Sequence, residues 1–474
     1  MLKITAELRI AVLDNSVDEK EIKLFGLTND INCNGSKIDS ISNLLFHGTN
    51  CAIIIHQVCA NARLYSYQLL DDAGRGNVND LKTAFDWCLM NNICLVNLSL
   101  GTTHFRDKSY IRNIVNHYAN KGLIIVAASA NSGYKTYPAS FSNVIGVISD
   151  DFFDISKGLI KQKGIDFVAP SNHEVEIDGN CTRLEKSNSY AAPYVTAMLG
   201  NIMINESCSN VCVARNKMAS GSGKVYYLPD WIETAWVSDK CGSSRDAYYF
   251  RVYEGDWEEN ISLFDTIVIN DKDEIKIFVD LGKNIVYLGK ELVECSFVDR
   301  HFWCREHRIS QIMEIEESNA NIEVPIIISR FRNIQDSIWW INGLKKRFAK
   351  DGYNVYSTSC KTESVLYDLE YIPEEFCEVV HNKKLCDFLY WQTYYCQSDA
   401  ILFALDMETD VTVDTLGMMA DIVVDLHNTN GLICVAIWCD DEITIEEEFV
   451  NLDEFAIDTL YQKILGIFTE DTDE

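Results

Sequence analysis

The sequence predicts an α/β protein, with a doubly wound, mainly parallel sheet in residues 1–205 and a second α/β, Rossmann-like region nearer the C-terminus. Short apolar runs alternate with amphipathic segments of helical length, which is the pattern of a parallel sheet covered by helices. In addition, 474 residues are too many for one hydrophobic core, so more than one domain is expected.

The alternation is clearest in residues 1–205, where runs such as LRIAVLD, CLVNLSLG and LIIVAASA are separated by LKTAFDWCLMNN and YIRNIVNHYANKG. Functional residues of a doubly wound sheet lie at the carboxyl ends of its strands. Asp14 and Ser99 end two of the apolar runs, and Asn131 follows a third. We therefore expect these three residues along one edge of the sheet.

The rest of the chain divides by composition. Glycine and serine clusters such as ASGSGK and KCGSS indicate a linker or loose connection. The expected segments are a first α/β domain over 1–205, a linker over 206–245, a small α/β unit over 246–320, and an acidic α/β domain over 321–474. The last segment begins with VPIIISRFRNIQDSIWWINGLKKRF at the place of a phosphate-binding loop, but lacks the glycines and lysine that cradle phosphates. We therefore do not expect this segment to bind a nucleotide. We expect it to be a recognition or assembly module.

Composition also bears on location. The start of the chain reads as a strand rather than a signal peptide, and no apolar run is long enough to span a bilayer. The 17 cysteines are scattered through apolar segments without a C-x-x-C pair, as expected for buried, reduced thiols. We expect a cytoplasmic protein that does not bind membranes.

Charge is unevenly distributed. Residues 1–205 carry 18 basic and 20 acidic side chains, whereas the whole chain carries 41 and 71, so nearly all of the net charge of −30 lies beyond residue 205. Nucleic-acid binding needs a basic face and is not expected. A solvated acidic surface explains this charge more simply than a docking face for a basic protein partner, and both interpretations stay open.

Four local motifs, in one order, carry candidate chemistry. IAVLDNSVD ends a buried strand at Asp14, and FHGTNCA opens an apolar helix at His47. IIVAASANSG places Asn131 just after a strand, and SNSYAAPYVTAML puts Ser189 at a helix start. A serine hydroxyl, an imidazole, a carboxylate and an amide donor are the groups that serine-based peptide hydrolysis requires.

These motifs, with NLSLG at 97–101 and YPASFSNVIGV at 137–147, make residues 1–205 resemble the subtilisin-like serine proteases. The resemblance implies that Asp14 orients His47, that His47 is the general base and then acid, and that Ser189 attacks the substrate. It implies that Asn131 is the oxyanion donor, acting with the Ser189 amide.

The resemblance also suggests how substrate is bound. Ser99, Leu100 and Gly101 would pair with the substrate backbone as an added strand. The expected S1 pocket, which lacks a carboxylate and so favours small or apolar P1 residues, is lined by Leu100, Ala127, Ser129, Ser132 and Thr136. The Tyr137–Pro138 bond is expected to be cis, and no propeptide and no calcium in the family's tight calcium loop are expected.

The sequence departs from the family pattern at several positions. Ser16 replaces a glycine, Asn50 replaces a histidine, and Ala130 replaces the glycine before the oxyanion asparagine, where a Cβ could strain the turn. The segment Ser187–Pro193 has Tyr190 where the family has methionine. None of these changes removes a required group.

Two further patterns in the C-terminal half have simple alternatives. His301, Cys304 and His307 form H-x-x-C-x-x-H, which lacks the fourth ligand of a structural zinc site, so neither a metal nor a cofactor is expected. Core packing explains the aromatic helical stretches better than a peptide groove does. Their residues are Trp339, Trp340, Phe388, Tyr390, Trp391, Tyr394 and Tyr395.

The sequence thus favours an intracellular serine endopeptidase that processes a specific peptide or protein, for example by removing a leader during peptide maturation. The acidic C-terminal region would choose the substrate or a partner, and its layout is faintly similar to accessory domains of bacterial peptide-maturation proteins. The alternatives are a catalytically silent scaffold that holds an extended peptide and a nucleotide-dependent regulator.

Overall fold

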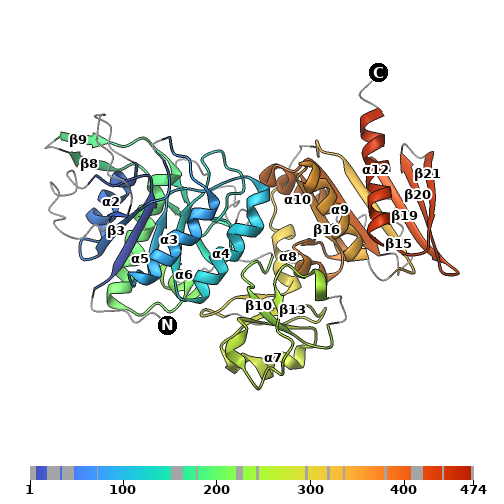
Figure 1. Ribbon diagram of the computed structural model, residues 1–474, viewed down its shortest axis with the longest axis horizontal. Coiled ribbons are helices and arrows are strands. Elements are labelled where there is room, and N and C mark those ends of the chain that lie inside the picture. Colours follow the sequence, from blue (N-terminus) through green and yellow to red (C-terminus); the bar gives the residue numbers. More distant parts are fainter. Residues whose placement is uncertain are drawn as a thin grey trace.

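In the computed structural model, seven parallel strands form the sheet of the N-terminal region, in the order β2-β3-β1-β4-β5-β6-β7 (Figure 1). The structure describes residues 7–18, 33–34, 47–71, 73–150, 164–177, 180–219, 228–241, 245–293, 297–317, 321–334, 337–377, 382–406, 420–439 and 442–470. The seven strands are β1 (Arg9–Asp14), β2 (Cys33–Asn34), β3 (Arg63–Gln68), β4 (Leu95–Leu98), β5 (Ile124–Ala128), β6 (Val144–Ser149) and β7 (Phe167–Ala169).

Helices cover both faces of this sheet. One face carries α2 (His47–Val58), α5 (Asn188–Asn205) and α6 (Val211–Ala219), and the other carries α3 (Val78–Met90) and α4 (Lys108–Asn120). Strand β5 shows why: Ile124, Val126 and Ala128 pack with α2 and α5, while Ile125 and Ala127 pack with α3 and α4. Since successive side chains of a strand point to opposite faces, an uninterrupted apolar run buries both sides of the sheet. The predicted doubly wound parallel sheet is confirmed. A hairpin of β8 (Glu174–Ile177) and β9 (Asn180–Arg183) lies beside it.

A five-stranded parallel sheet follows, in the order β11-β10-β12-β13-β14. Its elements are β10 (Thr234–Val237), β11 (Arg251–Val252), β12 (Thr266–Ile269), α7 (Lys272–Phe278), β13 (Asn284–Tyr287), β14 (Phe302–Trp303) and α8 (Arg305–Met313). Residues 206–245, expected to be a linker, therefore contain helix α6 and strand β10. Both are held by apolar packing, through Val211 and Ala214 in one core and Ala235 and Val237 in another.

The third sheet has seven strands in the order β17-β16-β18-β15-β19-β20-β21. Its elements are β15 (Ile326–Arg332), α9 (Ser337–Asp351), β16 (Val355–Ser359), β17 (Glu370–Tyr371), α10 (Asn382–Cys396), β18 (Ala400–Asp406), β19 (Ile422–Thr429), β20 (Leu432–Cys439), β21 (Glu442–Phe449) and α12 (Glu454–Glu470). Helices α9 and α12 pack on one face, and α8 and α10 on the other.

This sheet is mixed rather than wholly parallel, because β19, β20 and β21 pair antiparallel. Asn430 and Gly431 form the turn between β19 and β20, and both have positive φ, 53° and 88°. A two-residue turn with positive φ at both positions joins antiparallel neighbours directly. The chain therefore turns back here instead of crossing over through a helix, in contrast to the repeated strand–helix pattern expected from the sequence.

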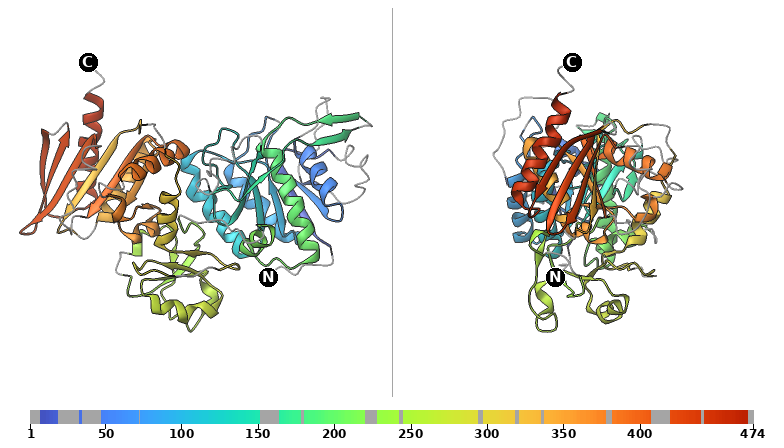
Figure 2. Two further views of the ribbon diagram at one scale, coloured as in Figure 1. Left: turned by 180° about the vertical axis from the view of Figure 1, so that it is seen from behind. Right: turned by 90° about the vertical axis from the view of Figure 1, so that its right-hand side faces the viewer.

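One buried cluster joins the second and third sheets: it contains Trp231 and Val268 from the middle of the chain and Ile327 and Trp340 from the third region. Figures 1 and 2 show the three regions in contact, with α10 beside α4 of the first region. Short 3₁₀ helices complete the described structure: η1 (Phe105–Asp107), η4 (Arg245–Ala247), η5 (Ile261–Leu263), η6 (Val279–Leu281), η7 (Thr362–Tyr367) and η8 (Glu374–Cys377). No helix in the described part of the chain combines the length and apolar character needed to cross a membrane.

Candidate active site

Asp14 and His47 form a close pair at the edge of the first sheet. Asp14 ends strand β1 and is only 2% exposed, and its two carboxylate oxygens lie 3.1 and 3.0 Å from Nδ1 of His47. The Asn15 amide also donates to Asp14 Oδ1, at 2.8 Å. A carboxylate bound to Nδ1 holds the imidazole in the tautomer whose Nε2 is free to accept a proton.

Local sequence explains why His47 begins helix α2 at this point. The Gly48 amide donates to Asn15 Oδ1 at 3.0 Å, so the loop after β1 caps the helix that carries the histidine. A Cβ on Gly48 would lie 2.7 Å from the Ser16 carbonyl oxygen. Glycine is therefore needed for helix α2 to approach the loop this closely. Serine at position 16, a departure from the family pattern, is accommodated because its carbonyl, not its side chain, faces Gly48.

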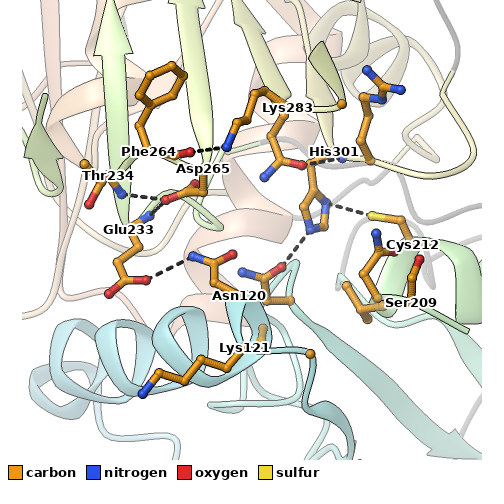
Figure 3. Close-up of a pocket in the computed structure, with 18 of the residues that line it drawn as sticks. Asn120, Lys121, Ser209, Cys212, Glu233, Thr234, Phe264, Asp265, Lys283 and His301 are labelled. Atoms are coloured by element: carbon orange, nitrogen blue, oxygen red, sulfur yellow. Dashed lines mark hydrogen bonds between the residues drawn. The ribbon is translucent and has the colours of Figure 1, made fainter. Parts of the chain in front are cut away.

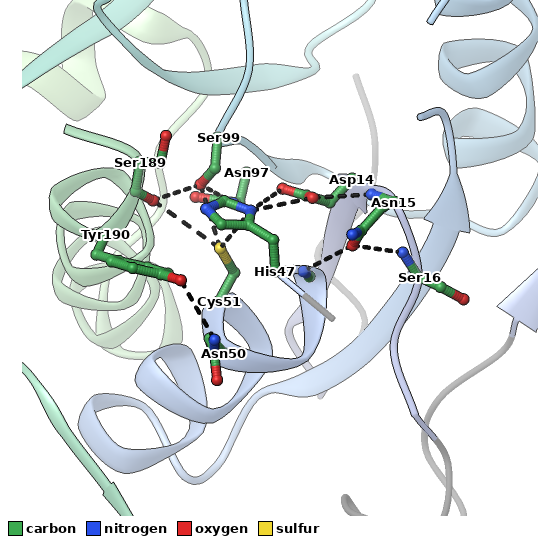
Figure 4. A network of polar contacts seen from close by, with 11 residues as sticks. Asp14, Asn15, Ser16, His47, Asn50, Cys51, Asn97, Ser99, Ser189 and Tyr190 are labelled. Carbon is green, nitrogen blue, oxygen red and sulfur yellow. Dashed lines mark hydrogen bonds and ion pairs between the residues drawn. The ribbon is translucent and has the colours of Figure 1, made fainter. Parts of the chain in front are cut away.

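Ser189 lies in the first turn of helix α5, next to this pair. Its carbonyl oxygen accepts a hydrogen bond from Ser99 Oγ at 2.8 Å, and the ring of the following residue, Tyr190, stacks on His47 with centroids 4.9 Å apart. In Figure 4 the imidazole lies between Asp14 and the start of α5. Among the described residues, however, no hydrogen bond joins the Ser189 hydroxyl to His47. Such bonds often form only once substrate is bound.

Asn131 follows strand β5 and faces the same edge. Its Oδ1 accepts the Asn188 backbone N–H at 2.9 Å, while Asn188 Nδ2 donates to the Ala130 carbonyl at 3.1 Å. Because the side-chain oxygen of Asn131 accepts this backbone N–H, the side-chain orientation is fixed. Its Nδ2 then points away from Asn188 and can donate to another group. Ala130 has no positive φ, so the strain considered for this turn is not found; Gly133, with φ of 79°, takes the left-handed position instead.

Asn131 and Ser189 share a cavity of about 380 Å³ with most of the residues expected to bind substrate. Of these residues, Ser99, Leu100, Gly101, Ser129 and Thr136 line the cavity, and Ser132 does not. The prediction for Ala127 was wrong: it is fully buried in the core with α3 and α4, and Ala128 lines the cavity in its place. Neighbouring residues of a strand point to opposite faces of the sheet, so an error of one residue exchanges the cavity face for the core face. The Tyr137–Pro138 bond at the cavity wall is cis, as predicted.

Cys51 is the residue of this site that sequence reasoning missed. It lies four residues after His47 on helix α2 and is fully buried, with its Sγ 3.8 Å from His47 Nδ1 and 3.4 Å from Ser99 Oγ. Ligand atoms of Asp14, His47 and Cys51 all lie within 4.8 Å of one another. The i, i+4 spacing of Cys51 from the candidate histidine was the available signal.

Burial and the neighbouring Cys51 and Asp14 side chains together set the pKa of His47. Burial lowers the pKa of the imidazole, but the Cys51 sulfur and the hydrogen bonds with Asp14 act in the opposite direction, and the net result is a raised pKa. Two groups that favour the imidazolium therefore outweigh desolvation.

Two departures from the family pattern contact each other. Asn50 Nδ2 donates to the Tyr190 hydroxyl at 3.2 Å, and the Tyr190 ring in turn stacks on His47. The residues that replace a histidine and a methionine thus form one pair that buttresses the imidazole. Single-position comparison could not reveal this pair, because its members are 140 residues apart.

A second pocket, of about 470 Å³, lies between the first region and the amino ends of the middle strands (Figure 3). His301 bridges the two parts, with Nε2 2.7 Å from Asn143 Oδ1 and Nδ1 3.5 Å from Cys212 Sγ. Both ring nitrogens of this member of the H-x-x-C-x-x-H motif therefore contact protein partners. None of the residues of the Asp14–His47 site lines this pocket.

The first region has a subtilisin-like α/β fold. Residues 5–210 match the sequence model of the subtilase family (Peptidase_S8), and this part of the chain belongs to that family. The chain is 31% identical over 153 residues to the minor extracellular protease Epr of Bacillus subtilis strain 168, which covers 30% of this chain and 23% of that protein. It is 30% identical over 219 residues to a thermophilic serine proteinase of Bacillus sp. strain AK1, covering 43% of this chain and 53% of the relative. The chain thus matches from about a quarter to about half of the length of these relatives.

Among solved structures, the chain is similar to the prenylagaramide maturation protease PagA, at 20% identity and a TM-score of 0.36, over 46% of this chain and 85% of that one. It is also similar to a cold adapted subtilisin-like serine proteinase, at 19% identity and a TM-score of 0.36, over 46% of this chain and 83% of that one.

Proposed function

We propose that this chain is a serine endopeptidase in which Ser189 attacks the peptide carbonyl and His47 first accepts the serine proton and then delivers it to the leaving amine. Asp14 holds His47 with Nε2 as the acceptor. The observation that carries the proposal is the pair of contacts at 3.1 and 3.0 Å between the Asp14 carboxylate and His47 Nδ1, next to the helix start that bears Ser189. A serine nucleophile, an imidazole base and a carboxylate that orients the base are the groups of a catalytic triad.

In this proposal the oxyanion of the tetrahedral intermediate is bound by Asn131 Nδ2 and the Ser189 backbone amide. Support comes from the hydrogen bond of Asn131 Oδ1 to the Asn188 amide, which fixes the orientation of the side chain. A peptide would lie as an extended strand along Ser99–Gly101, with its P1 side chain in the 380 Å³ cavity. The described residues that line the cavity include no acidic or basic side chain, which favours a small or apolar P1 residue.

The proposal extends to a processing role inside the cell, with no metal or cofactor. The large C-terminal region packed on the peptidase domain favours a selected peptide or protein over bulk degradation. Fifteen of the 17 cysteines are described as free thiols, nine of them buried, which fits a reducing compartment.

A fluorophosphonate probe tests the central claim. If Ser189 is activated, the probe should label the wild type but not Ser189→Ala. Intact mass measures the labelling. Wild-type protein that has not been treated with the probe should then cleave few members of a panel of leader-containing peptides and unfolded proteins. Digestion of every unfolded protein offered would contradict the processing role.

A catalytically silent peptide-binding scaffold is the second candidate. It is favoured by the lack of a hydrogen bond between the Ser189 hydroxyl and His47 in the described structure. An unlabelled wild type that still binds an extended peptide would select this alternative.

Replacing Asn131 with leucine should lower kcat with little change in KM, because the amide donor acts mainly in the transition state. The size expected is that seen on removing the equivalent donor of subtilisin, about 10²–10³-fold. Steady-state kinetics on a peptide substrate measure this effect, with Ser132→Ala as the control because Ser132 does not line the cavity. A rise in KM alone would argue against an oxyanion role.

The raised pKa of His47 predicts a pH effect of Cys51. Since the imidazole must be neutral to accept the serine proton, a raised pKa moves the acidic limb of kcat/KM to higher pH. Cys51→Val removes one of the groups that raise this pKa, so the limb should move to lower pH. Cys88→Ala, a buried thiol on helix α3, is the control and should leave the profile in place. A limb that stays fixed or moves to higher pH in Cys51→Val would contradict the assignment.

A further inference from the structure

The loop of residues 129–138 carries Asn131 and forms one wall of the candidate substrate cavity. Its parts are joined internally: Thr136 Oγ1 accepts the Ala130 amide at 2.8 Å and donates to the Tyr134 carbonyl at 2.9 Å. Tyr137 also pairs with Thr102 across the cavity through two backbone hydrogen bonds of 2.9 and 2.8 Å. A displacement at residues 134–135 therefore shifts both the cavity wall and the segment that aims Asn131.

The C-terminal half of the chain holds this loop directly. The Lys135 amide donates to the Tyr395 carbonyl at 2.9 Å, and the Tyr134 ring packs edge-on against the Tyr394 ring, with centroids 5.6 Å apart. Tyr394 and Tyr395 belong to the last turn of helix α10, which Figures 1 and 2 show beside the peptidase region. The loop thus gains a main-chain bond and an aromatic contact from more than 250 residues away.

The electrostatic surroundings of Lys135 include groups of the C-terminal half. Burial opposes the positive charge of Lys135, but the surrounding acidic groups, Cys396, Tyr137 and Glu370, raise its pKa well above the ordinary value. Glu370 is itself hydrogen-bonded to Arg308, and the attraction of Arg308 and Lys135 outweighs burial and lowers its pKa. Lys135 is therefore a half-buried cation, and Glu370 of the C-terminal half is one of the groups that favour its charge.

A second group of charges secures helix α4 to the same part of the interface. Arg112 and Lys108 of α4 lie 2.6 and 2.8 Å from Asp368 Oδ1, and Lys345 of α9 donates to the Asp368 carbonyl at 2.6 Å. Arg112 is 2% exposed, and Asp368 has a positive φ of 62°, which directs its carboxylate within a tight turn. The two halves are consequently held in one relative position at this point, next to the cavity loop.

We propose that the end of helix α10 positions the loop 129–138, so that the C-terminal half is a working part of the substrate cavity. Tyr394 and Tyr395 are positioning residues: they act through Tyr134 and Lys135 and do not touch substrate. The inference rests on the proposed endopeptidase function and assigns the appended region a role in P1 selection and in aiming Asn131.

Tyr394→Ala tests this proposal, because Tyr394 is 51% exposed and its truncation leaves the buried core intact. A small misplacement of a catalytic donor costs up to about 10²-fold, so kcat should fall between roughly 10- and 100-fold. The ratio of kcat/KM for small over large apolar P1 residues should change in the same variant. Tyr394→Phe keeps the ring contact and should behave as the wild type.

A matched control is His117→Ala. His117 also joins the peptidase region to a later part of the chain, through Glu233 at 2.9 Å, but it lies at the far end of helix α4 and does not line the cavity. Its loss should leave both kcat and P1 preference unchanged. Equal effects of His117→Ala and Tyr394→Ala would reduce the contact to general stability and overturn the proposal.

Hydrogen exchange supplies a readout that needs no catalysis. In Tyr394→Ala the amides of residues 133–137 should exchange faster, and in Tyr394→Phe and His117→Ala they should not. If the wild type neither labels nor cleaves, the endopeptidase function fails while this exchange still tests the loop contact. If the wild type is active and Tyr394→Ala changes neither exchange, kcat nor P1 preference, the inference alone fails.

Discussion

Ser189→Ala should lower kcat by about 10⁶-fold, the size known for the nucleophile of subtilisin. The reason is that His47 and Asp14 have no function without the hydroxyl that the imidazole deprotonates. Adding His47→Ala to Ser189→Ala should therefore cause almost no further loss, since the three residues act as one unit. Single-turnover kinetics with purified variants measure both effects.

Ser187→Ala is the matched control for this experiment. Ser187 precedes helix α5 in the same segment but its side chain makes no capping hydrogen bond, so its loss should leave kcat nearly unchanged. A multiplicative loss in the double variant, or residual activity well above that expected from Asn131 and substrate binding alone, would indicate a different nucleophile.

Asp14→Asn should lower kcat by about 10⁴-fold at neutral pH while the fold is kept. The Asp14 carboxylate accepts from His47 Nδ1 with both oxygens, at 3.1 and 3.0 Å. An asparagine amide can donate to Nδ1 instead, which places the imidazole proton on Nε2, the atom that must accept the serine proton. The size is carried over from the serine proteases with this triad.

Thermal unfolding and fluorophosphonate labelling check this second prediction. Asp80→Asn on helix α3, which changes the charge equally without lying near His47, serves as the control. An unfolding temperature close to that of the wild type together with full labelling in Asp14→Asn would contradict the role given to Asp14.

Much of the peptidase region could be predicted because its signals are local. Uninterrupted apolar runs identify strands buried on both faces, and their ends place Asp14, Ser99 and Asn131 at one edge of the sheet without knowledge of the packing. Family motifs supplied the order and the candidate roles. It is harder to predict on which face of the sheet a given strand residue lies, as Ala127 shows. Its neighbour Ala128 lines the cavity, whereas Ala127 lies in the core.

The second half was harder to predict because patterning does not distinguish parallel from antiparallel neighbours. The apolar run of β20 suits either arrangement, and the Asn430–Gly431 turn, which was a readable hairpin signal, decides for antiparallel pairing. Likewise, glycine- and serine-rich segments indicated a linker over 206–245, but α6 and β10 lie within this range and pack into cores.

The amino-acid sequence by itself determined the fold class of residues 1–205, the candidate groups Asp14, His47, Asn131 and Ser189, and the cis bond before Pro138, because these follow from local pattern and family motif. Only the tertiary structure decided that Cys51 and Tyr190 lie against His47, and that Tyr394 and Tyr395 contact the cavity loop. The physical reason is distance along the chain: such contacts join segments up to hundreds of residues apart, and short-range periodicity contains no information about which segments become neighbours.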